Sequence, residues 1–216
     1  MEDKERATLV QKKWSNNLLF LILCTSLHTL VNKYVLSTLK FQYPTLFISW
    51  QCGVCVFLLM SAHALGYTEL SGVDRSVLRI WLPSMILHTA VMYFGSVSLS
   101  KLAIPIFIGL QNLSYVYIEL FNFWKSKLIP TTTAQVSVTI IGFGAMYLFY
   151  YNLKDNQDAF KWISAYVFCS GLYLLFSEIM KDTKLSAINR IFYNSFFCVI
   201  FLTVVSIVTR EWLKFF

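Results

Sequence analysis

Apolar residues occur in seven long runs separated by short polar segments, and this alternation dominates the chain. Each run is about 20 residues long, the length that an α-helix needs to cross the hydrocarbon core of a bilayer. The pattern predicts spans at residues 17–36, 45–64, 80–99, 102–122, 133–152, 160–179 and 191–209. We therefore expect an all-α fold, a polytopic membrane helix bundle of about seven spans.

The polar segments between the runs are too short to form an extramembrane domain. Residues 1–16 are polar and charged, and the apolar run that follows has no small-residue cleavage site, so it is expected to be a retained first span. This division predicts an N-terminal cytosolic segment at 1–16, a transmembrane helical domain at 17–209 and a C-terminal tail at 210–216. Function is therefore expected among the helices.

Composition supports a membrane protein. Hydrophobic residues make up 57% of the chain and charged residues only 13%, which is too few to cover a soluble domain. The net charge of +7 does not indicate nucleic-acid binding, because the basic residues lie between the apolar runs and form no stripe. The pair Cys52 and Cys55 has metal-site spacing but no second pair and no histidine at ligand spacing, so we expect packing. No metal and no cofactor is expected.

Lys and Arg are more numerous in the segments that share a side with the N-terminus, beginning with Lys4 and Arg6. The positive-inside rule then places the N-terminus in the cytosol. This orientation argues against a seven-helix receptor, whose N-terminus is external. Tryptophans near predicted span ends are expected to lie at the headgroup level, and Trp50 fits this pattern less well. The tryptophans near span ends are Trp14, Trp81, Trp124, Trp162 and Trp212.

Three ionisable side chains inside predicted spans stand out, because each requires a partner or a polar cavity. Lys33 either snorkels to the interface or faces inward toward an anion. Glu119 and Glu178 are expected to form interfacial ion pairs with Lys125 and Lys181. No Ser/His/Asp set and no pair of carboxylates occurs at one depth, so the chain is not expected to be an enzyme.

Uncharged polar residues are dense in three spans. Thr25, Thr29 and Asn32 share one helical face, which either lines a polar path or binds neighbouring helices. The fourth span contains Gln111 and Asn112. The polar residues of the seventh span are Tyr193, Asn194 and Ser195.

Five segments resemble the nucleotide-sugar transporters of the drug/metabolite transporter superfamily, especially the GDP-mannose transporter group. They read VNKYVL at 31–36, FQYPTLF at 41–47, SLSKLAIPIF at 98–107, QNLS at 111–114 and FYNS at 192–195. The last is similar to a seventh-helix FYNN motif that contacts the nucleotide in that group. The segments follow one another in the order that the family has, so each match strengthens the others.

The resemblance implies an exchanger that takes a cytosolic nucleotide sugar into the Golgi, or alternatively the endoplasmic reticulum, as a nucleoside monophosphate leaves. It implies no cofactor. A phosphate-bearing substrate needs cationic and amide donors and an aromatic side chain for its base. The substrate-binding residues expected from this resemblance are Asn32, Lys33, Gln111, Asn112, Tyr193, Asn194 and Ser195.

The sequence also departs from the family pattern. Family members resemble two five-helix inverted repeats, whereas this chain supplies the first repeat and two helices of the second, without the GALNK segment that contacts the sugar diphosphate. Gln111 stands where the GDP-mannose group has a lysine, so the sugar is not named. A second reading is a shortened, non-transporting isoform that binds a full-length partner or a second copy of the chain.

Overall fold

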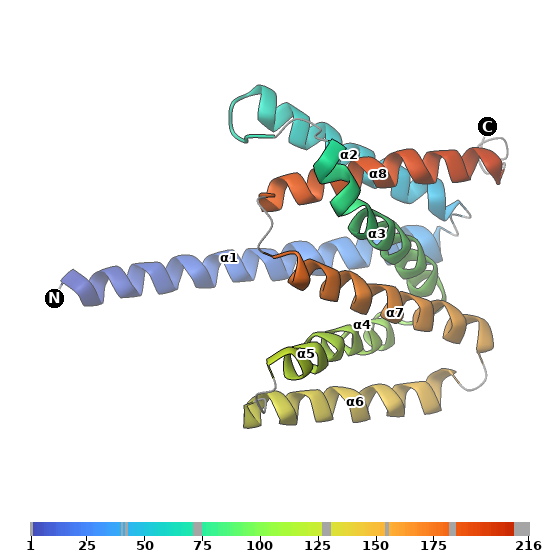
Figure 1. The fold of residues 1–216 in the computed structure, drawn as a ribbon. Coiled ribbons are helices and arrows are strands. Elements are labelled where there is room, and N and C mark those ends of the chain that lie inside the picture. Colours follow the sequence, from blue (N-terminus) through green and yellow to red (C-terminus); the bar gives the residue numbers. More distant parts are fainter. Residues whose placement is uncertain are drawn as a thin grey trace. The chain divides into compact units, whose positions relative to one another are not determined.

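The computed structural model describes residues 2–39, 41, 43–70, 75–126, 131–153, 156–181 and 185–209, with side chains from residue 17 onward except at 126, 152 and 153. Within these residues every regular element is a helix. The elements are α1 Glu2–Lys33, the π-helix η1 Tyr34–Thr38, α2 Pro44–Ala64, α3 Arg75–Lys101, α4 Ile104–Gln111, α5 Leu113–Ser126, α6 Thr132–Leu153, α7 Gln157–Ile179 and α8 Ala187–Val208 (Figure 1).

Seven helical stretches of the described residues are long and apolar enough to cross a membrane, which confirms the predicted all-α, seven-span bundle. The stretches are Asn17–Thr38, Pro44–Ala64, Arg75–Lys101, Ile104–Lys125, Thr132–Tyr151, Gln157–Ile179 and Ala187–Val208. The chain is a multi-pass membrane protein. The predicted tail at 210–216 lies outside the described residues.

Helix ends follow local sequence. Pro44 occupies the first turn of α2 and Pro105 the first turn of α4, where a missing backbone N–H costs nothing. The fourth predicted span is two helices rather than one, because it is interrupted at Asn112. The Tyr115 N–H donates to the Asn112 carbonyl at 3.1 Å. This is a 3₁₀-type hydrogen bond, which spans three residues instead of the four of an α-helix.

The chain divides into two compact units, residues 1–41 and 42–216. The first unit consists of α1 and η1, and α1 begins at Glu2, so the polar segment before the first span is helical as well. In the second unit α3 packs against α7 and α8, and α2 runs beside α8 (Figure 1). The pair α4–α5 packs between α7 and α6. The core of this unit is therefore centred on α3, α7 and α8.

Small and weakly polar side chains are part of the contact between α2 and α8, beside the buried apolar side chains of Ile48 and Leu202. The Ser49 hydroxyl donates to the Val199 carbonyl at 3.4 Å and lies 2.9 Å from the Thr203 hydroxyl. Beside them Cys52 and Cys198 are buried, at 4% and 0% exposed. Small residues let helix backbones approach closely inside a bilayer, and their hydroxyls bond across the contact. Cys52 therefore has the packing role predicted for it.

Replacing Ser49 with alanine tests this contact. We expect the free energy of unfolding to fall by about 0.6 kcal/mol, the typical value for an interhelical hydrogen bond in a membrane. Ser61→Ala is the matched control, because among the described residues the Ser61 hydroxyl donates only to the Phe57 carbonyl of its own helix. Unfolding of both variants in mixed detergent micelles gives the comparison. Equal losses for the two variants would contradict an interhelical role for Ser49.

Candidate functional site

The FYNS segment lies in the second turn of α8, just after the helix begins. Ser186 caps the helix by accepting a hydrogen bond from the Asn189 N–H at 3.3 Å, which fixes where α8 starts. Tyr193, Asn194 and Ser195 are all buried, at 3%, 2% and 5% exposed. The three predicted site residues of α8 are therefore held inside the helix bundle.

Asn194 joins three helices through its side-chain amide. Its Oδ1 accepts a hydrogen bond from the Trp81 indole N–H of α3 at 3.0 Å. Its Nδ2 donates to the Tyr173 hydroxyl of α7 at 3.2 Å. An asparagine amide has two N–H donors and two acceptor lone pairs, so within the described residues one N–H and one lone pair remain for another partner. Asn194 can thus hold the bundle together and still offer a donor and an acceptor.

The residues on either side of Asn194 face different neighbours. The Tyr193 ring packs in an apolar cluster with Trp81 and Met85 of α3. The Ser195 hydroxyl lies 3.7 Å from the Cys55 sulfur of α2. The motif therefore connects α8 to α2, α3 and α7, and a ligand can reach Asn194 only if some of these helices separate.

Trp81 and Tyr173 are partners of Asn194 that the sequence analysis missed. Trp81 was expected near a span end, and its side chain is 1% exposed and bonded to Asn194, so it faces the interior of the bundle. The helix α3 begins at Arg75, before the predicted start of the third span at residue 80, so Trp81 lies more than a turn from the end of the helix. Its place at the headgroup level stays a prediction.

Gln111 and Asn112 lie at the junction of α4 and α5, where Gln111 is half-buried and Asn112 is exposed. The helix α4 packs against α3, α5, α6 and α7, while α8 packs against α2 and α3. The structure thus does not place the α4–α5 junction against the α8 motif. These two groups of predicted site residues stay apart in this conformation.

Asn32 and Lys33 belong to the first unit and end α1, directly before the π-helix η1. The Asn32 amide lies 3.3 Å from the His28 ring one turn earlier. The Thr29 hydroxyl, on the same face, donates to the Thr25 carbonyl at 2.9 Å. The predicted polar face therefore exists, and within the first unit its groups bond along their own helix.

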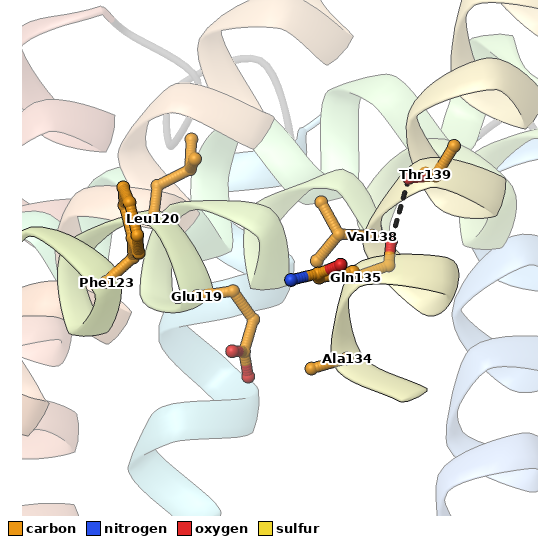
Figure 2. A pocket seen from close by; sticks show the side chains of 7 residues that line it. All are labelled: Glu119, Leu120, Phe123, Ala134, Gln135, Val138 and Thr139. Atoms are coloured by element: carbon orange, nitrogen blue, oxygen red, sulfur yellow. Dashed lines mark hydrogen bonds between the residues drawn. The ribbon is translucent and has the colours of Figure 1, made fainter. Parts of the chain in front are cut away.

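A cavity of about 400 Å³ lies between α5 and α6 (Figure 2). Its polar lining residues are Glu119, Gln135 and Thr139, and apolar side chains such as Phe123 and Val138 supply most of the rest. Among the described residues Glu119 forms no ion pair with Lys125, which instead lies 6.0 Å from the Phe121 ring. The ion pair predicted for Glu119 was therefore wrong.

The ion pair predicted for Glu178 is confirmed, because its carboxylate lies 3.4 Å from the Lys181 ammonium. Lys181 follows the end of α7, so this pair sits at the edge of a span. Within the described part of the chain no three His, Cys, Asp or Glu side chains gather as a metal site.

Two relatives share the name TMEM241. The UDP-N-acetylglucosamine transporter TMEM241 of Mus musculus is 35% identical over 182 residues, which cover 82% of this chain and 60% of that protein. The UDP-N-acetylglucosamine transporter TMEM241 homolog of Xenopus laevis is 32% identical over 81% of this chain and 59% of that protein. The chain therefore spans about three fifths of the length of these curated relatives.

A third relative is GDP-mannose transporter 1 of Cryptococcus neoformans, 26% identical over 85% of this chain and 53% of that protein. No protein-family model and no solved structure matches the chain. All three relatives carry the names of nucleotide-sugar transporters, and each match extends over more than four fifths of this chain. The chain belongs to the nucleotide-sugar transporter family.

Proposed function

We propose that the chain serves nucleotide-sugar transport, exchanging a cytosolic nucleotide sugar for a luminal nucleoside monophosphate. The observation that carries this proposal is the buried amide of Asn194, held at the meeting of α3, α7 and α8 with a donor and an acceptor to spare. A buried polar group between membrane helices costs free energy, so it marks a place where a polar ligand passes. Family membership supplies the ligand class.

UDP-N-acetylglucosamine is the first substrate to test, since it appears in the names of both TMEM241 relatives. Asn112 and Lys33 are further proposed substrate-binding residues, an amide and a cation. Gln111, Asn32, Tyr193 and Ser195 complete the proposed set. We place the protein in the Golgi membrane, or alternatively the endoplasmic reticulum, with a cytosolic N-terminus, as the basic residues of the N-terminal segment favour.

Exchange measured in proteoliposomes tests the proposal. We expect vesicles that hold the 216-residue chain and a nucleoside monophosphate to take up radiolabelled UDP-N-acetylglucosamine saturably, above empty vesicles. Asn112→Ala should lower uptake about tenfold, the cost of one or two lost hydrogen bonds, without unfolding the protein, because Asn112 is exposed. The control is Asn17→Ala, an exposed asparagine at the start of the first span.

GDP-mannose and UDP-galactose belong in the same panel, with the same preloaded vesicles. Uptake of only one of these two nucleotide sugars would support transport by the chain and identify that sugar as its substrate instead of UDP-N-acetylglucosamine. A folded chain that takes up none of them would contradict transport by this chain alone. Co-purification with a full-length family member would then favour the partner-binding reading.

A further inference from the structure

Arg190 lies one turn before Asn194 on α8, and its guanidinium closes the corner between α7 and α8. Its Nη2 donates to the carbonyls of Met180 and Lys181 at 3.2 and 3.1 Å, just past the end of α7. Its Nε donates to the Leu185 carbonyl at 3.2 Å. Carbonyls at a helix end have no partner within the helix, so one side chain here satisfies three carbonyl groups of the corner.

The same guanidinium lies over the Trp81 indole, with its carbon 5.2 Å from the ring centroid. A planar guanidinium against an indole face is a favourable cation–π contact, and it gains strength where water is excluded. Trp81 is 1% exposed. The Trp81 ring is thus oriented by Arg190 on its face and by Asn194 at its N–H, with the Phe176 ring in edge contact 5.9 Å away.

Trp81 determines which way the Asn194 amide points. An indole N–H can only donate a hydrogen bond. It therefore bonds to the amide oxygen of Asn194 and cannot bond to the amide nitrogen. The Tyr173 hydroxyl both donates and accepts, so it would bond either end. Without a fixed Trp81 the amide could therefore turn over and exchange its donor and acceptor.

We propose that Arg190 is a positioning residue for the transport site: it fixes the Trp81 indole, and the indole fixes the donor and acceptor that Asn194 presents to a ligand. The proposal rests on the proposed transport function, because it concerns how that site is oriented. It goes beyond the family motif, since Arg190 and Trp81 both lie outside the FYNS segment.

The kinetic test separates positioning from a general role in folding. In the proteoliposome assay with UDP-N-acetylglucosamine, Arg190→Gln should raise KM on the order of tenfold, as expected for one misplaced hydrogen bond. The maximal rate per folded protein should stay within about twofold. Trp81→Phe keeps a ring for packing but loses the N–H, so it should raise KM in the same way.

Arg79→Gln is the matched control, since it removes the same charge from an exposed site on α3, and its KM should equal that of the original chain. Arg190→Lys keeps the charge and loses the planar contact, so its KM should lie between those of the original chain and Arg190→Gln. It replaces Arg190→Gln as the test variant if that variant does not fold. A fall in maximal rate with unchanged KM in both Arg190 variants would overturn the proposal.

A second measurement does not depend on transport. The chain has six tryptophans, and labelling them with 5-fluorotryptophan gives a ¹⁹F NMR signal for Trp81 that Trp81→Phe identifies. Arg190→Gln and Asn194→Ala should each shift that signal, and Arg79→Gln should not. A Trp81 signal unmoved by Arg190→Gln would overturn the positioning role. A shifted signal in a chain that transports nothing would instead refute the proposed function.

Discussion

Replacing Asn194 with alanine is expected to lower the free energy of unfolding by about 2 kcal/mol. The substitution leaves the Trp81 indole N–H without its acceptor and removes the Asn194 N–H from the Tyr173 hydroxyl, both between membrane helices. A buried polar group that loses its partner costs about 1–3 kcal/mol, and interhelical bonds measured in membranes reach about 1.7 kcal/mol. Unfolding in mixed micelles, followed by tryptophan emission, gives the value.

The same substitution paired with Trp81→Phe tests where the loss comes from. Because phenylalanine has no N–H to leave unsatisfied, the double variant should lose about 1 kcal/mol less than the sum of the two single variants. Asn17→Ala, at an exposed site, should change stability by less than about 0.5 kcal/mol. Additive losses would mean that Asn194 and Trp81 do not interact in the folded protein.

The positions of the spans could be predicted from the sequence because the bilayer imposes a length and a hydrophobicity on every crossing helix. The second span was predicted at 45–64 and is α2 Pro44–Ala64, and the sixth was predicted at 160–179 and is α7 Gln157–Ile179. Hydropathy contains this information residue by residue.

The partners of each side chain could not be predicted in the same way. Trp81 is compatible both with the headgroup region and with a buried contact, and only the fold shows that Asn194, 113 positions away, accepts its N–H. Glu119 illustrates the same limit, since a nearby lysine on the chain did not become its partner. The FYNS segment was found by resemblance, whereas its contacts depend on how α3, α7 and α8 meet.

Replacing Gly171 with alanine is expected to lower the free energy of unfolding by about 1–3 kcal/mol, the usual cost of overpacking a tight contact. Gly171 lies on α7 where α5 packs against it, and an added Cβ would come within 2.5 Å of Tyr117 Cδ2 and 2.8 Å of Tyr117 Cγ. Because turning the ring about χ2 leaves Cγ in place, it cannot relieve the clash, so either the Tyr117 side chain changes its χ1 rotamer or the two helices move apart.

Gly142→Ala on α6 is the matched control, because a Cβ there meets nothing within 4 Å. That substitution should be neutral or stabilising by up to about 1 kcal/mol, since alanine favours the helix more than glycine. Tyr117→Ala should remove the clash, so that Gly171→Ala costs almost nothing in that background. A Gly171→Ala variant as stable as Gly142→Ala would mean that α5 and α7 do not approach this closely at Gly171.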